Sequence, residues 1–250
     1  MLRLSFPVLA LSAIALAPVS SSASSITFTD STIDSANYTE SPEFTSNATL
    51  DYDFCTNCGQ GGVPGLQVTL FSTGTADDPG LGGIAFINTT FSYNPAAGAV
   101  LSISASVDKI LTDSIINGGA GNTFRPTIEQ NGNYYLAAIA GPSIPDGSDT
   151  TGWNTLAASG LQASDFEEYD FTTGAFVDAN PNFSSGAMLF GLAQTFTNPG
   201  AFNATAIYDP LQITLTTVPE PSTWAMLAIG FASLGVFARR ATRKQASSAA

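Results

Sequence analysis

Apolar and polar residues alternate with a period of two along most of this 250-residue chain. Alternation of this kind places one side of a β-strand in a core and the other side in water. It recurs in segments 26–29, 49–54, 66–70, 101–108, 188–192 and 211–216. The residues that this pattern predicts in the core are Leu66, Val68, Leu101, Ile103, Phe190, Ile213 and Leu215.

The connections between these segments favour antiparallel strands. Asn131-Gly132 separates two apolar segments and supplies the positive φ angles that a two-residue hairpin needs. The one short helical turn that we expect covers 163–169, where Ser164 and Glu167 have the spacing of a capping box. Without a repeat period or a long amphipathic helix, the sequence predicts an all-β fold, an antiparallel β-sandwich or jelly roll.

Both ends of the sequence differ from its middle. Residues 1–23 combine Arg3, an apolar run and small residues, which is the pattern of a signal peptide cut by signal peptidase. We therefore expect one extracellular domain over residues 24–217, followed by a targeting segment over 218–244 and a disordered tail over 245–250. The sequence has 20 acidic and seven basic residues. Residues 24–217 contain 19 of the acidic residues and two of the basic ones, so this part has a formal charge of −17. Such a charge disfavours nucleic acid as a partner.

The two cysteines, Cys55 and Cys58, are separated by two residues. A pair at this spacing can close a short loop, form a redox couple or supply half of a zinc site. Zinc needs about four ligands, and the sequence has neither histidine nor a third cysteine. Redox pairs usually accompany a βαβ context, which the pattern lacks. We expect a structural disulfide between the two, no metal site and no cofactor.

Catalytic chemistry has few candidates in this sequence. The absence of histidine excludes Ser-His-Asp and Cys-His catalysis. Paired carboxylates, as used by glycosidases, remain in Asp51 with Asp53 and in the acidic segment 165–170. Both sets also fit solvent-facing positions, and this is the interpretation that we favour. The acidic loops at 77–78 and 146–149 could bind calcium, but neither has the EF-hand pattern.

Three aromatic residues could stack on sugar rings. They are Trp153, Tyr134 and Tyr135. Tyr134 and Tyr135 are adjacent in an expected strand, so at most one of them points into the core. Trp153 is a candidate glycan contact, although burial in the sandwich core is the commoner outcome for tryptophan.

The C-terminal part begins with Val218-Pro219-Glu220-Pro221 and continues with an uncharged apolar run over 222–238. A helix of that length reaches about 25 Å, near the lower limit for crossing a bilayer. The basic cluster Arg239, Arg240, Arg243 and Lys244 follows and would stay in the cytoplasm by the positive-inside rule. These features predict a single transmembrane helix with the large domain outside.

The Pro-Glu-Pro motif, the apolar run and the basic cluster together resemble the PEP-CTERM sorting signal of Gram-negative bacteria. That resemblance implies that Pro219, Glu220 and Pro221 are recognised by exosortase, a membrane-embedded transpeptidase that removes the tail. The middle of the chain resembles concanavalin-A/laminin-G-type jelly rolls in stretches such as 66–70 and 209–215. It departs from such relatives at Tyr208-Asp209-Pro210-Leu211, where they carry an Asp-Asn-Trp-like stretch.

Two classes of function follow. The first is a non-enzymatic surface or extracellular-matrix protein, anchored transiently in the inner membrane during sorting and binding exopolysaccharide. The second is a carbohydrate-active hydrolase that uses a carboxylate pair. The lack of a clear catalytic set favours the first.

Overall fold

The computed structural model describes residues 23–116, 121–137, 152–198, 200–218 and 230. Short 3₁₀ helices cover η1 (Ser35–Asn37), η2 (Pro95–Ala97) and η3 (Ala163–Asp165). The strands of the described residues are β1 (Ser24–Asp30), β2 (Tyr38–Glu40), β3 (Phe44–Ser46), β4 (Ala48–Cys55), β5 (Gly65–Ser72), β6 (Gly80–Tyr93), β7 (Val100–Ile116), β8 (Gly121–Gln130), β9 (Asn133–Ala137), β10 (Asn154–Leu161), β11 (Phe166–Asp170), β12 (Ala175–Val177), β13 (Met188–Asn198) and β14 (Phe202–Thr217).

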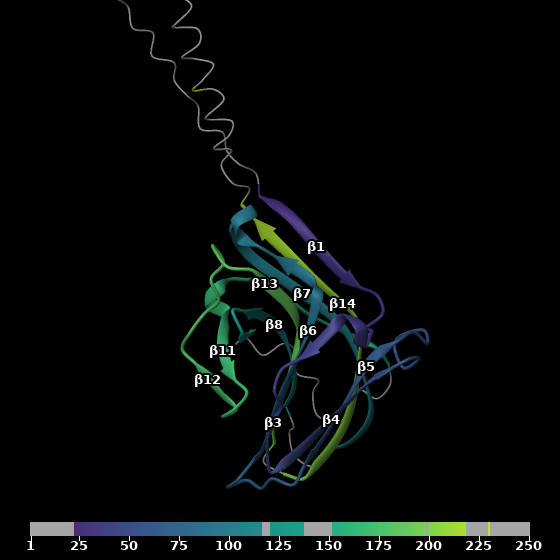
Figure 1. The fold of residues 1–250 in the computed structure, drawn as a ribbon. Coiled ribbons are helices and arrows are strands. Elements are labelled where there is room, and N and C mark those ends of the chain that lie inside the picture. The colour runs from purple at the N-terminus through teal and green to yellow at the C-terminus, as the bar shows by residue number, and fades with distance from the viewer. Residues whose placement is uncertain (1–22, 117–120, 138–151, 199, 219–229, 231–250) are drawn as a thin grey trace, which may run out of the picture.

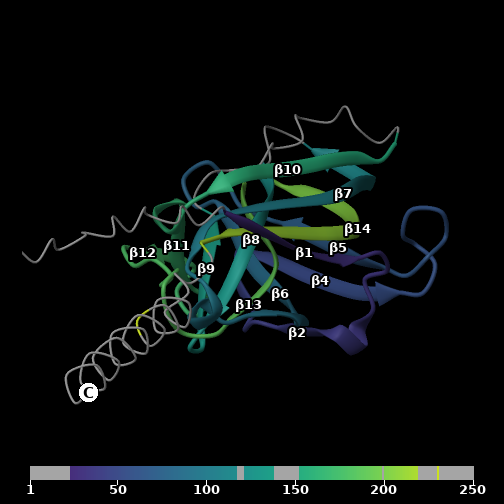
Figure 2. The same ribbon diagram turned by 90° about the horizontal axis from the view of Figure 1, so that it is seen from above.

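These strands form two antiparallel sheets that pack face to face (Figure 1). The six-stranded sheet has the order β10-β7-β14-β5-β4, and β1 pairs with the C-terminal half of β14. Figure 2 shows this sheet from above, with β10 at its outer edge. The eight-stranded sheet has the order β12-β11-β9-β8-β13-β6-β2, and β3 also pairs with β6. The predicted all-β antiparallel sandwich is therefore confirmed.

The core between the sheets contains most of the residues that the alternation predicted. Six of the seven are buried: Leu66, Val68, Ile103, Phe190, Ile213 and Leu215. The prediction for Leu101 is wrong, since 48% of this residue is exposed. The pairing of β7 with β14 shifts there, with Thr216 opposite Ser102 but Thr217 opposite Val100. Leu101 is thus the extra residue of a bulge, which turns it outward and buries Val100 in its place.

The predicted hairpin joins β8 to β9. Asn131 and Gly132 have φ angles of 58° and 83°, as a two-residue turn requires. The predicted helical turn is shorter than expected and is confined to η3, where Gln162 N donates to Asp165 Oδ2 at 2.8 Å. Ser164 and Glu167 are therefore not its capping pair, because β11 begins at Phe166 and pairs with β9.

Lys109 lies in the core, which alternation alone would reserve for apolar side chains. It follows Val107 on the inward side of β7 and its side chain is 0% exposed. Its ammonium group is 5.4 Å from the centre of the Tyr208 ring, and no hydrogen-bond acceptor lies near it among the described residues. Burial lowers the pKa of Lys109 from 10.5 to about 7. The Tyr208 hydroxyl donates to Gln194 Oε1 in the opposite sheet.

A disulfide joins Cys55 at the end of β4 to Cys58 in the following loop. The loop returns to the sheet at Gly65, which pairs with Cys55. Within it, Gln60 N donates to Asp209 Oδ2 at 3.2 Å, so the loop is tied to β14 as well.

We expect the purified protein to lack free thiols, since the loop holds the two cysteines together and the sequence has no competing cysteine. Intact mass should be lower by two hydrogens than for the reduced chain, and a thiol reagent should label it only after reduction. Labelling of the unreduced protein, or a disulfide-linked dimer, would contradict the intramolecular bond.

The expected targeting segments lie largely outside the described residues. Of the expected signal peptide they include only Ala23, and of the expected apolar helix only Gly230. Among the residues that the structure describes, no helix is both long enough and apolar enough to cross a membrane.

Candidate functional site: an aromatic hollow on the eight-stranded sheet

A second group of apolar side chains lies on the face of the eight-stranded sheet that is turned away from the core. Tyr135 faces the core, so its neighbour Tyr134 in β9 faces the opposite side. We call this group the outer cluster: Ala85, Leu136, Tyr169, Phe171 and Ala193, with Tyr134 packed against them.

The aromatic rings of the outer cluster pack against one another. Phe171 contacts Tyr134 edge-on with ring centres 5.4 Å apart, and it contacts Tyr169 at 4.7 Å. Tyr169 also contacts Phe176 of β12 at 5.0 Å. Edge-to-face pairs of this kind add about 0.5–1.5 kcal/mol to the burial of the rings, so the cluster is a rigid surface.

Small residues on the central strands leave room for these rings. A side chain at Gly83 of β6 would come within 3.1 Å of the Tyr169 hydroxyl. A side chain at Gly174, in the turn between β11 and β12, would collide with the ring of Phe44 in β3. β11 and β3 lie on opposite sides of the sheet order, so their proximity shows that the sheet curls around the outer cluster.

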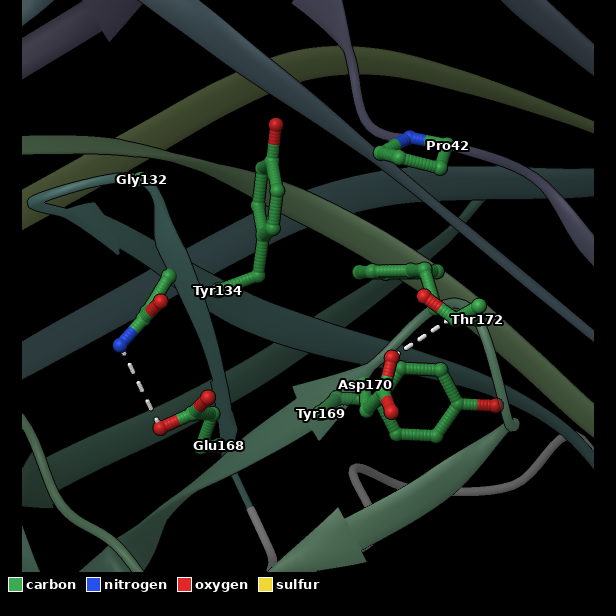
Figure 3. A pocket seen from close by; sticks show the side chains of 9 residues that line it. Pro42, Gly132, Tyr134, Glu168, Tyr169, Asp170 and Thr172 are labelled. Atoms are coloured by element: carbon green, nitrogen blue, oxygen red, sulfur yellow. Dashed lines mark hydrogen bonds between the residues drawn. The ribbon is translucent and has the colours of Figure 1, made fainter.

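A hollow of about 170 Å³ opens beside the outer cluster. Figure 3 shows Tyr134 and Pro42 along one side of it and Glu168, Tyr169 and Asp170 along the other. The residues that line it are Pro42, Gly132, Asn133, Tyr134, Glu168, Tyr169, Asp170, Phe171 and Thr172. The hollow therefore combines an aromatic wall with two carboxylates.

Hydrogen bonds fix the carboxylates of the hollow. Asp170 accepts from Thr172 N at 2.7 Å and from Thr173 Oγ1 at 2.9 Å. These donors, those of Thr172 first, lower the pKa of Asp170. Glu168 accepts a longer bond of 3.5 Å from Asn133 Nδ2 (Figure 3).

The tyrosines of the hollow are neutral hydrogen-bond donors at physiological pH. Burial, helped by Glu129, raises the pKa of Tyr134. Burial also raises the pKa of Tyr169, against the opposing effect of Arg125. Neutral phenols and carboxylates together offer both donors and acceptors to hydroxyl groups, next to an apolar ring surface.

The carboxylates considered from sequence do not come together as a set. Asp51 and Asp53 are exposed on β4, an edge strand of the other sheet, and do not line the hollow. Of the acidic segment 165–170, only Glu168 and Asp170 do. The described residues contain no group of three or more potential metal ligands, and 146–149 lies outside them.

Of the three aromatic residues predicted as possible sugar contacts, only Tyr134 lines the hollow. Tyr135 is in the core and Tyr134 is at the hollow, so one of the pair is buried as predicted. Trp153 is partly exposed rather than buried in the core, and it does not line the hollow. Sequence reasoning missed Pro42, Tyr169, Phe171 and Thr172, although the alternation of Glu167 to Phe171 was a signal for a strand with an aromatic face.

The sorting residues predicted from sequence lie outside the described residues. This holds for Pro219, Glu220 and Pro221 and for the basic cluster Arg239, Arg240, Arg243 and Lys244. Val218, the last described residue before them, donates its N–H to Ala99 O at 2.9 Å. The chain is therefore held to the sandwich up to the residue that precedes Pro219.

Comparison with known proteins identifies the C-terminal part. Residues 217–244 match the PEP-CTERM protein-sorting motif, which confirms the resemblance noted for that segment. No curated protein matches the chain.

The similarity of the chain to solved structures is distant. A structure of promiscuous carbohydrate-binding modules of the β-sandwich superfamily is 16% identical with a TM-score of 0.31, covering 70% of this chain and 56% of that one. The CBM22-1–GH10 modules of a Clostridium thermocellum xylanase, complexed with xylohexaose, are 14% identical with a TM-score of 0.33, covering 70% and 26%. A xylan-binding domain from Paenibacillus barcinonensis is 12% identical with a TM-score of 0.32, covering 76% and 94%.

The chain thus spans about half the length of the first of these structures and about a quarter of the second. With all three TM-scores below 0.35, the likeness assigns no ligand to this chain.

Proposed function

We propose that this chain, which carries a PEP-CTERM sorting motif over residues 217–244, is an exported surface or matrix protein whose sandwich binds polysaccharide. The observation that supports binding is the hollow, whose lining includes the ring pair Tyr134 and Phe171 as well as Glu168 and Asp170. Apolar C–H faces of sugar rings pack on aromatic rings, while carboxylates and tyrosine hydroxyls bond sugar hydroxyls.

The route to the surface follows from the two ends of the chain. In our proposal, signal peptidase removes residues 1–23, and the apolar run over 222–238 holds the protein briefly in the inner membrane. Exosortase then recognises Pro219, Glu220 and Pro221 and cuts the tail away, including the basic cluster and residues 245–250. The domain over 24–217 reaches the cell surface or the extracellular matrix.

We further propose that the protein is not an enzyme. Glycoside hydrolysis needs two carboxylates on either side of the bond that is cut. Glu168 and Asp170 are two residues apart on one strand, β11, and Asp170 also accepts hydrogen bonds from the turn that follows it. If the protein were a hydrolase, it would cleave a glycan that it binds into shorter products.

A panel of soluble hexasaccharides tests the proposal. It contains neutral, amine-bearing and uronate sugars, with affinity measured by titration calorimetry and products by mass spectrometry. We expect binding of at least one class without cleavage. Binding of none would reject the polysaccharide proposal, and cleavage would favour the hydrolase.

A further inference from the structure

No basic side chain lines the hollow. The sequence contains only two basic residues between 24 and 217, Lys109 and Arg125. Lys109 is enclosed in the core. Arg125 is half-buried: its Nε donates to Thr195 Oγ1 at 2.9 Å, and its guanidinium lies 5.1 Å from the centre of the Phe176 ring. Neither residue lines the hollow, although Arg125 acts electrostatically on Tyr169, so no basic side chain contacts a ligand there directly.

Carboxylates, in contrast, gather at the hollow. Glu168 and Asp170 line it directly. Glu129 accepts from Gly132 N at 2.7 Å and acts electrostatically on the Tyr134 hydroxyl. Because Thr172 and Thr173 donate to Asp170, that carboxylate stays ionised into mildly acidic solution.

The carboxylates and the aromatic wall line one hollow from the two sides of the sheet edge, since Glu168 pairs with Tyr135 and Tyr134 faces the opposite side. A polysaccharide that crosses this edge can contact both. Tyr134 lines the hollow, and its ring packs against Phe171 at the outer cluster. An aromatic ring packs on the apolar face of a sugar, while a carboxylate accepts hydrogen bonds from an ammonium group. With about 170 Å³, the hollow is smaller than the 300–1,000 Å³ typical of drug-sized ligands, so it suits a single sugar ring of a longer chain.

We propose that the hollow selects sugars that carry a free, protonated amino group over neutral sugars and uronates. This inference rests on the proposed polysaccharide function and specifies its substrate class. The ammonium group would donate to Glu168 and Asp170, while a sugar ring of the same chain packs against Tyr134. A uronate carboxylate would instead meet two negative charges, with no basic side chain among the residues that line the hollow.

Three β-1,4-linked hexasaccharides that differ only at carbon 2 test this selection. They are the glucosamine hexamer, the N-acetylglucosamine hexamer and cellohexaose, which carry an ammonium, an acetamide and a hydroxyl group. Calorimetry would use the full-length protein in a detergent without sugar groups, at about pH 5.5, where ordinary carboxylates are ionised. We expect the glucosamine hexamer to bind at least tenfold more tightly than cellohexaose.

Glu168→Gln is the decisive variant, since it keeps the shape of the side chain and removes its charge. It should reduce the preference for the glucosamine hexamer severalfold and leave the affinity for cellohexaose unchanged. Asp53→Asn is the matched control, because it removes one exposed charge from β4 of the other sheet. It should leave the preference intact.

The outcomes separate this inference from the proposed function. Equal affinity for all three hexamers would overturn the amine selection while supporting polysaccharide binding. An equal loss of preference in Glu168→Gln and Asp53→Asn would also overturn it, because the attraction would then come from the overall charge. If no hexasaccharide of the wider panel binds, the proposed function itself fails.

Discussion

Replacing Pro219, Glu220 and Pro221 together by alanine should stop release of the protein while leaving its insertion into the membrane unchanged. The apolar run over 222–238 and the basic residues behind it remain, and in our proposal these determine insertion and orientation. What the variant loses is the rigid tripeptide that a sorting protease would recognise within the matched motif. Full-length protein should therefore accumulate in the inner membrane.

Cell fractionation with one tag on the sandwich and one on the extreme C-terminus measures this effect. The wild type should lose the C-terminal tag and appear at the surface, whereas the triple variant should keep both tags. Alanine at Ser222 and Thr223, which follow the motif, provides the control and should be processed normally. If the triple variant is shortened and released like the wild type, the tripeptide serves only to begin a helix.

Lys109→Met should stabilise the sandwich by a few kcal/mol at pH 7. Methionine has a similar length, and it removes an amine that is buried without an acceptor among the described residues. Replacing a buried charge by an apolar group of similar volume is often stabilising. For a domain of this size, thermal unfolding should shift upward by roughly 5 °C or more.

The pH dependence gives this prediction a distinctive signature. Burial lowers the pKa of Lys109 to about 7, whereas its ordinary value is 10.5. Between these pH values the unfolded chain binds one more proton than the folded chain. The stability of the wild type should therefore rise with pH across this window, and below about pH 7 the penalty stays at its maximum.

Lys109→Met should remove this rise, so the variant and the wild type should approach each other in stability near pH 10. Thr112→Met, at an exposed position of the same strand, should leave the rise intact. Thermal unfolding at several pH values measures all three proteins. A Lys109→Met variant that is less stable than the wild type at pH 7 would show that the ammonium group contributes a favourable interaction.

The architecture was largely predictable because period-two alternation records which side of a strand faces the core. The pattern located β4, β5 and the last part of β14, and Asn131-Gly132 located the hairpin between β8 and β9. It failed at Leu101, because a bulge depends on the partner strand and shifts the alternation by one residue.

The hollow was less predictable because its parts are far apart in the sequence. Pro42, Tyr134 and Phe171 meet only when β11 pairs with β9 and the sheet curls. Alternation identifies outward-facing residues, but it does not indicate which of them pack together into a second cluster. Lys109 illustrates the converse limit, since its position fits the core side of β7 while its charge argues for solvent.

The sorting motif was the most predictable feature, since its information is local. Motif, apolar run and basic residues are contiguous in the sequence, and the match over residues 217–244 requires no long-range contact.

The affinity of Tyr134→Ala for the glucosamine hexamer and for cellohexaose tests the central claim most directly. Tyr134 provides the aromatic wall of the hollow, while its removal leaves the core side of β9, with Tyr135, intact. Tyr52→Ala is the control, since Tyr52 is a tyrosine of β4 that is 36% exposed and lies outside the hollow. We predict that Tyr134→Ala weakens binding of whichever hexamer the wild type binds by about tenfold or more, which corresponds to ~1.4 kcal/mol, and that Tyr52→Ala does not. Unchanged affinity in a folded Tyr134→Ala protein would contradict the assignment of the hollow as the polysaccharide site.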